Sequence, residues 1–250
     1  MNTIKRLVVC MILLCFSLLL SGRVTALEKE RKIVFQSSIN LLGDEEVETI
    51  VLSGVEKEGS PFYEDIKITV FEEKTGKLLH AISPNVNYGF NPKLSIIDFD
   101  LDGISEVFYS AESGLNEKNG YFYVFSFNGE FNVVYDFEVD INPFTAKYQN
   151  YYKVSVKRAD KEFLIDITSK GSNYLNKLYT PNGKLQKQCL ASVSKVNSVI
   201  PYYNYLKNEY FIKVVRKVSG ENASDFICNA ACDLEFKNGK FIPLKTYVEI

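Results

Sequence analysis

Apolar and polar residues alternate along several stretches of the chain. Between Phe131 and Ile141 every second residue is apolar, and the segments 66–70 and 163–167 alternate in the same way. A period of two places successive side chains on opposite faces, so each stretch is predicted to be a β-strand with one buried face. No amphipathic helix longer than two turns is expected after residue 30. The expected fold class is therefore all-β.

Four glycine turns divide the chain into segments of similar length. In each, the glycine is followed by a charged and then an apolar residue, and asparagine precedes three of the four. The glycines are Gly76, Gly129, Gly183 and Gly239, and the intervals between them are nearly equal. Asn-Gly supplies the positive φ angles of a tight hairpin turn, so each turn is predicted to join two strands.

This period predicts a repeat architecture. Four units of about 54 residues, each with about four short strands, are typical of the blades of a β-propeller. The segment 32–36 is expected to pair with 245–249 and close the ring. A β-sandwich is the alternative, although it does not require equal spacing.

The first residues are predicted to be an export signal. Lys5 and Arg6 precede the 14-residue apolar run 7–20, and Val24-Thr25-Ala26 supplies small residues for cleavage. The run is shorter than the roughly 20 residues of a spanning helix. We expect a signal peptide over residues 1–26, a single repeat domain over 27–250, and secretion or display at the cell surface. An uncleaved membrane anchor is the alternative.

Charge argues against some partners. Without residues 1–26 the chain has 26 basic and 31 acidic residues, a net charge of −5. A mildly acidic chain without a block of Lys or Arg is not expected to bind nucleic acid or anionic lipid. The expected mature chain is therefore not embedded in a membrane.

The mature chain has three cysteines. Cys228 and Cys232 are four apart in a predicted strand and so about 13 Å apart, too far for a disulfide. A bond from Cys189 to either stays open, and buried free thiols are favoured. A zinc site is not expected, because no fourth ligand has a suitable spacing.

One loop has the residues of a calcium site. In Asp98-Phe99-Asp100-Leu101-Asp102-Gly103-Ile104-Ser105-Glu106, carboxylates stand at positions 1, 3, 5 and 9 and glycine at position 6. Calcium takes six to eight oxygen ligands in a flexible geometry. The predicted ligands are the side chains of Asp98, Asp100, Asp102 and Glu106 and the backbone carbonyl of Ile104. A solvated acidic turn is the alternative.

A degenerate copy of this loop lies earlier in the chain, over the segment 40–48. Aligning Glu48 with Glu106 places Asn40 at position 1 and Asp44 at position 5. Leu42 replaces the second carboxylate and Glu45 replaces the glycine, so this second site is expected to be weak or empty. The stretch 201–209 keeps only its final acid, Glu209.

The intact loop, followed by Val107-Phe108-Tyr109, resembles the calcium loop of FG-GAP or VCBS repeats, the blades of integrin-α-like propellers. Other matching stretches are Gly43-Asp44, 60–63, Asn91-Pro92 and 171–176. The resemblance extends to small secreted VCBS-repeat proteins of spore-forming Gram-positive bacteria over about residues 33–250. It implies an exported, non-catalytic, calcium-stabilised propeller, sometimes linked to the spore or cell surface.

Catalysis is not expected. The single histidine, His80, stands in no catalytic motif, and no nucleophile elbow, phosphate loop or zinc-protease motif is present. The expected function is a structural or ligand-binding module at the cell envelope or spore surface, where its partner is an unidentified protein or glycan. A secreted glycan-active enzyme is the alternative.

Tyrosines gather in two stretches. Exposed aromatic rings bind sugars or proteins, but filling the space between strands is favoured. The residues are Tyr148, Tyr151, Tyr152, Tyr202, Tyr203, Tyr205 and Tyr210.

Overall fold

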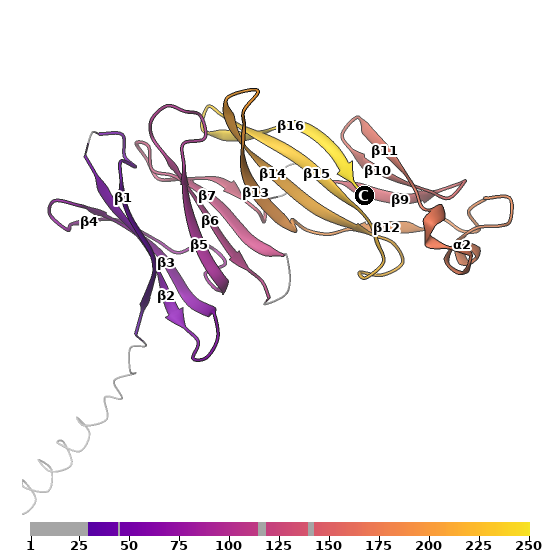
Figure 1. The fold of residues 1–250 in the computed structure, drawn as a ribbon, viewed down its shortest axis with the longest axis horizontal. Coiled ribbons are helices and arrows are strands. Elements are labelled where there is room, and N and C mark those ends of the chain that lie inside the picture. The colour runs from indigo at the N-terminus through magenta and orange to yellow at the C-terminus, as the bar shows by residue number, and fades with distance from the viewer. Residues whose placement is uncertain (1–29, 45, 115–118, 140–142) are drawn as a thin grey trace, which may run out of the picture. The chain divides into compact units, whose positions relative to one another are not determined.

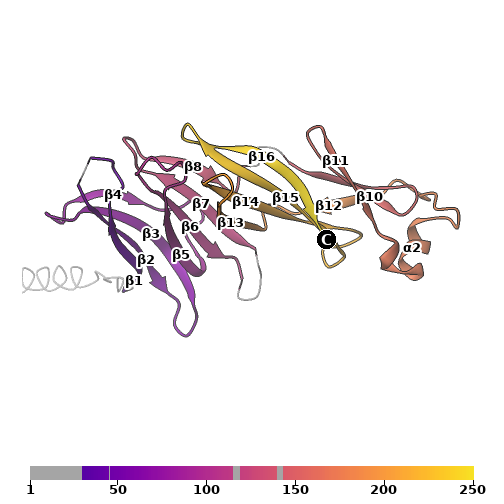
Figure 2. The same ribbon diagram turned by 45° about the horizontal axis from the view of Figure 1, so that its top comes forward.

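Antiparallel strands make up most of the computed structural model, which describes residues 30–250 except 45, 115–118 and 140–142 (Figures 1 and 2). The first eight strands form one sheet in the order β1-β2-β3-β5-β6-β7-β8, with β4 beside β3. Their bounds are β1 (Lys32–Ile39), β2 (Glu48–Glu56), β3 (Phe62–Glu72), β4 (Leu78–Ile82), β5 (Gly89–Ile97), β6 (Glu106–Glu112), β7 (Gly120–Ser126) and β8 (Asn132–Asp136).

The second sheet has the order β11-β10-β9-β12-β14-β15-β16, with β13 beside β14. A 3₁₀ turn, η1 (Thr168–Lys170), and the seven-residue helix α2 (Ser172–Leu178) precede β12. The strands are β9 (Thr145–Gln149), β10 (Lys153–Arg158), β11 (Lys161–Asp166), β12 (Leu190–Val193), β13 (Ser198–Asn204), β14 (Glu209–Ser219), β15 (Phe226–Lys237) and β16 (Lys240–Glu249). The all-β prediction is therefore confirmed.

Most of the predicted turns connect paired strands. Gly76, Gly129 and Gly239 lie between β3 and β4, β7 and β8, and β15 and β16, with φ angles of 69°, 74° and 71°. Gly183 instead follows α2, in a turn closed by the bridge between Tyr179 and Leu185. The left-handed backbone at each glycine explains why the sequence places the smallest residue there.

Separate four-stranded blades are not seen among the described residues, so this part of the fold prediction needs correction. Short ladders join the segments into two large sheets: β3 pairs with β5 through Phe62 and Tyr63, and β12 connects β9 to β14. The expected closure also fails, because β1 pairs with β2 and β16 with β15 at the ends of their sheets. The turn period predicts local hairpins, but partners of the outer strands depend on contacts between distant segments.

Residues Lys32–Ile250 form one compact unit, with three apolar clusters. One face of β6 contributes Val107 and Tyr109 to a cluster with β2 and β3, and the opposite face contributes Phe108 to a cluster with β13–β16. Burial of both faces explains why three consecutive residues of this strand, Val107-Phe108-Tyr109, are apolar. The third cluster lies between β9–β12, α2 and the strands β14 and β15. Both views accordingly place β13–β16 between β5–β8 and β9–β12 (Figures 1 and 2).

A partly buried polar network ties α2 to the second sheet. The Asp225 carboxylate accepts hydrogen bonds from the Tyr174 hydroxyl (2.6 Å), Lys170 Nζ (2.6 Å) and the Glu221 amide (2.9 Å). The Tyr148 hydroxyl lies 2.5 Å from that of Tyr174. Burial alone would raise the pKa of Asp225, but its bonds from Lys170 and Tyr174 hold that pKa below the ordinary value. The carboxylate is therefore stabilised in its charged form.

The Tyr109 hydroxyl is buried and has no hydrogen-bond partner among the residues that the structure describes. A buried hydroxyl without a partner has lost its hydration without compensation. We expect Tyr109→Phe to raise the free energy of unfolding by about 1 kcal/mol. Tyr123→Phe is the matched control, because the Tyr123 hydroxyl accepts a bond from the Val86 amide, and it should lower stability by about 1 kcal/mol. Urea unfolding compares the two, and a loss of stability in Tyr109→Phe would contradict the expectation.

The three cysteines of the described chain are free thiols. Cys228 and Cys232 are buried, as favoured from the sequence, and burial raises the pKa of Cys228 to about 11. Such thiols are poor nucleophiles.

The predicted signal peptide, residues 1–26, lies outside the described residues. Within the part of the chain that is described, no helix is long and apolar enough to cross a membrane.

Candidate metal-binding loop

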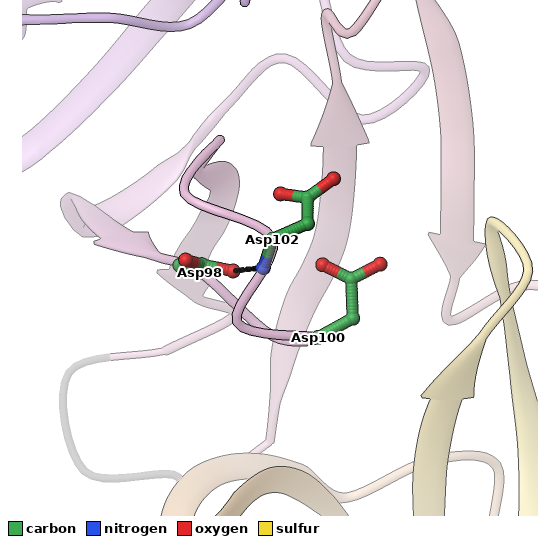
Figure 3. A group of neighbouring side chains, drawn as sticks. All are labelled: Asp98, Asp100 and Asp102. Carbon is green, nitrogen blue, oxygen red and sulfur yellow. Dashed lines mark hydrogen bonds between the residues drawn. The ribbon is translucent and has the colours of Figure 1, made fainter.

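The loop between β5 and β6 brings three predicted ligands together. Asp98, Asp100 and Asp102 each offer a carboxylate oxygen, and these oxygens all lie within 4.8 Å of one another (Figure 3). Asp98 is half-buried, while Asp100 and Asp102 are exposed. The spacing of every second residue predicted this grouping, and the structure confirms the proximity.

Hydrogen bonds within the loop hold its shape. Asp98 accepts bonds from the amides of Asp102 (3.1 Å) and Gly103 (2.9 Å), and Asp102 accepts one from the amide of Ile104 (2.8 Å). Gly103 has a φ of 92°, a conformation that favours glycine. The backbone thus turns sharply enough to present the carboxylates on one side.

Glu106 occupies a different place from the three aspartates. It is the first residue of β6, only 4% exposed, and its Oε2 accepts a bond from the Phe99 amide (3.2 Å). Glu106 is therefore buried against the backbone of the loop. It is not one of the three grouped acids. The sequence predicted Glu106 as a ligand but did not reveal that it holds the loop backbone. The Ile104 amide donates a hydrogen bond to Asp102. The predicted ligation through the Ile104 carbonyl stays a prediction.

Like charges and burial destabilise the charged carboxylates here. Burial, then the charges of Asp102 and Asp98, raise the pKa of Asp100 above its ordinary value. Burial raises the pKa of Glu106 to about 7, with further contributions from the aspartates and an opposing one from the Phe99 amide. A cation between these groups would relieve the repulsion.

The degenerate loop between β1 and β2 shares two hydrogen-bond patterns with the intact loop. Glu48 is buried and accepts bonds from the amides of Leu41 (2.8 Å) and Leu42 (3.3 Å), as Glu106 does from Phe99. Asp44 accepts a bond from the amide two residues on, at Glu46 (3.2 Å), as Asp102 does from Ile104. The sequence alignment of the two loops therefore matches their hydrogen bonds.

The first loop lacks the group of acids found in the second. Asn40 accepts a bond from the Gly43 amide (2.8 Å), and no group of three potential ligands is found there among the described residues. The two loops are close in space, because a β-carbon on Gly43 would lie 2.5 Å from Ile104 Cδ1. Nothing in the sequence indicated this approach between two segments that are distant in the chain.

Phe99 connects the loop to the second sheet. Its side chain is 1% exposed, and its ring centroid lies 5.1 Å from that of Phe241, 6.1 Å from Phe236 and 6.2 Å from Tyr210. A cavity of about 250 Å³ adjoins these rings. It is lined by Phe99, Asp100, Glu209, Tyr210, Glu235, Phe236, Lys237 and Asn238. Carboxylates of the second sheet thus lie near the loop.

The tyrosine stretches have mixed surroundings. Tyr148 is buried, whereas Tyr205 is 87% exposed at the tip of the β13–β14 hairpin. The ring of His80 packs against that of Phe127 at 5.4 Å.

Comparisons with known proteins indicate a relationship different from the one predicted. Residues 142–249 match the family model for the YybI C-terminal domain. The chain is 25% identical over 217 residues to Uncharacterized protein YybI of Bacillus subtilis (strain 168), covering 85% of this chain and 82% of that protein. Rhamnogalacturonan lyase PL11 of Bacillus licheniformis has a TM-score of 0.36 and 14% identity over 87% of this chain and 34% of the lyase. This chain thus spans about a third of that lyase's length.

The predicted relationship to FG-GAP and VCBS repeats is therefore wrong. The family model that matches is the YybI C-terminal domain, and the relative is YybI. The match begins at residue 142, beyond the acidic loop on which the resemblance depended most. A short acidic loop forms through local contacts and can join any two antiparallel strands, so it does not identify a family.

Proposed function

We propose that this protein is a non-catalytic module stabilised by one calcium ion in the loop 98–106. The observation that carries the proposal is the convergence of three aspartate oxygens within 4.8 Å. Carboxylates so close repel one another unless a cation lies between them.

The donor atoms suit calcium better than a transition metal. All three grouped side chains offer hard carboxylate oxygens, the ligands that calcium prefers, whereas zinc and copper favour nitrogen and sulfur. Asp98 and Asp102 accept bonds from loop amides, yet a carboxylate has about four lone-pair sites and retains capacity for an ion. When bound, calcium would neutralise the acids and brace the loop against the start of β6.

The wider proposal is an exported module that binds an unidentified protein or glycan at the cell surface. It is supported by the predicted export signal and by the absence of catalytic motifs from the sequence. Sequencing the mature protein tests export, because cleavage after Ala26 would give a chain that begins at Leu27. A mature chain that retains residues 7–20 would contradict cleavage.

Calcium should raise the melting temperature. An extracellular-type affinity of roughly 0.1 mM, with calcium near 1 mM, would add about 1.4 kcal/mol to the free energy of unfolding. Asp100→Asn should abolish this increment, because it removes one charge while keeping the side chain's shape. The measurement is thermal unfolding in calcium and in chelator, with calorimetric titration for stoichiometry.

Asp160→Asn is the control, since Asp160 is an exposed acid in the β10–β11 turn. It should leave the calcium increment unchanged. Asp44→Asn should also leave it unchanged, because the first loop is expected to be weak or empty. Two results would contradict calcium binding by the loop: a wild-type melting temperature that does not change with calcium, or a calcium-dependent increase in stability that is unchanged in Asp100→Asn.

A further inference from the structure

Three neighbouring strands of the first sheet direct a polar patch into a cavity. Lys93 of β5 pairs with Ser110 of β6, and Ser110 pairs with Phe122 of β7, so these residues form one row on the same face. In the next row Glu112 pairs with Gly120. All five residues line the cavity. The patch thus combines a cation, a carboxylate and a hydroxyl with one aromatic ring.

An irregularity in β5 adds an amide. The register shifts between Phe90 and Lys93, and Asn91 has a φ of 48°. Its Nδ2 donates to Glu112 Oε2 (3.1 Å), and its backbone amide donates to the Pro61 carbonyl (3.1 Å). Bulges of this kind redirect side chains and are common beside binding sites. Here the bulge brings the Asn91 amide group to one oxygen of Glu112 and so orients the carboxylate.

Close packing leaves no room for a side chain at Gly120, which pairs with Glu112. A β-carbon there would lie 2.6 Å from the Ala111 carbonyl oxygen and 2.8 Å from Phe122 Cζ. The strands therefore require glycine at this position, because the Ala111 carbonyl and the Phe122 ring already occupy the space that a side chain would take. A glycine inside a strand commonly marks close approach of another group.

Strand β13 supplies the facing wall of the cavity. Ser198 and Ile200, two residues apart on this strand, line the cavity together with Asn119. The volume is about 400 Å³, within the range of small-molecule sites. The residues that line the cavity therefore come from β5–β7 and β13, strands that are labelled in Figure 1. Glu112 ends β6, whereas the aspartate loop precedes the start of that strand.

We propose that this cavity binds a neutral sugar ring. The formal charges of Lys93 and Glu112 cancel, which disfavours phosphates, nucleotides and metal ions, since these need a surplus of one sign. Hydroxyl groups of a sugar can donate to Glu112 and accept from Lys93, while the C–H face of the sugar ring packs on Ile200, which is 47% exposed. A single ring in an open cavity should bind with a dissociation constant of the order of 1 mM.

Nuclear magnetic resonance titration of the full mature chain tests the proposal. The probes are glucose, galactose and N-acetylglucosamine, added separately, with saturation transfer to the sugar and amide shifts of Ser110, Glu112 and Ser198 as readouts. At least one sugar should produce both signals. Glu112→Gln should weaken its binding about tenfold, because hydrogen bonds to a charged acceptor are the stronger ones. Lys93→Met, which keeps the apolar stem, should also weaken it.

Glu58→Gln is the matched control, because Glu58 is an exposed acid in the β2–β3 turn. This variant should bind the sugar with the same affinity as the wild-type protein. Glu112→Gln can still accept the bond from Asn91, so its spectrum should show a folded chain. Binding should persist in chelator and in Asp100→Asn, which separates this proposal from calcium binding. Three outcomes would overturn it: no response to any of the sugars, unchanged affinity in both pocket variants, or binding that requires calcium.

Discussion

Phe99→Ala is expected to lower the free energy of unfolding by about 3–5 kcal/mol, the usual cost of truncating a fully buried phenylalanine. The Phe99 side chain is 1% exposed and contacts three aromatic rings of the second sheet. Its removal leaves a cavity where the two sheets meet. Because Phe99 lies between Asp98 and Asp100, we also expect the calcium increment in stability to fall.

Urea unfolding in chelator and in calcium separates the two effects. The loss measured in chelator reports packing alone, and the difference between the two conditions reports calcium linkage. Leu101→Ala is the control, since Leu101 belongs to the same loop but is 45% exposed, and it should change stability by no more than about 0.5 kcal/mol. Equal effects of the two substitutions would show that Phe99 does not anchor the loop.

Gly220→Ala should destabilise the protein by about 3 kcal/mol or more, because a β-carbon there has no room. It would clash with Asp225 Oδ2 and with the hydroxyls of Tyr148 and Tyr174, the last at 2.6 Å. These oxygens belong to the partly buried network that holds α2, so they cannot move without losing hydrogen bonds. Overpacking costs about 1–3 kcal/mol, and disturbing the partly buried Lys170–Asp225 ion pair adds to that.

Gly129→Ala isolates a different effect and serves as the control. Gly129 has a φ of 74° but nothing within 4 Å of a β-carbon, so alanine there should cost only the backbone strain of about 1–2 kcal/mol. Introducing Tyr174→Phe with Gly220→Ala should recover part of the loss, since it removes one clashing oxygen. If Gly220→Ala unfolds at the same urea concentration as wild type, the network is not a tight constraint.

The local sequence of the acidic loop predicts the grouping of its aspartates but not the role of Glu106. Asp98, Asp100 and Asp102 are neighbours in the chain, so their spacing alone predicted that their oxygens converge. Glu106 has the same residue type, yet its burial and its bond to Phe99 depend on how β6 packs between two clusters. Glu48 holds the equivalent position in the first loop and also accepts bonds from loop amides. An acid at the first residue of the strand after each loop was therefore the sequence signal that could have indicated this role.

The sugar pocket could not have been predicted in the same way. Asn91, Glu112 and Gly120 come together through strand register and a bulge, and Ser198 arrives from a strand much further along the chain. None of these residues stands in a motif. The register between strands is set by side-chain packing over the whole sheet. The sequence of a single segment carries no information about that packing.

By itself, the sequence determined the all-β class, three of the hairpin turns and the clustering of the three aspartates, because alternation, Asn-Gly backbone preference and close spacing act over a few residues. The predicted strand over 131–141 is shorter in the structure, where β8 ends at Asp136. Only the tertiary structure decided that the strands join into two eight-stranded sheets, that β13–β16 pack against β5–β8, and that Glu106 and Phe99 lie beneath the loop. These arrangements depend on burying apolar faces from distant segments against one another, and many pairings of similar strands satisfy the same local pattern.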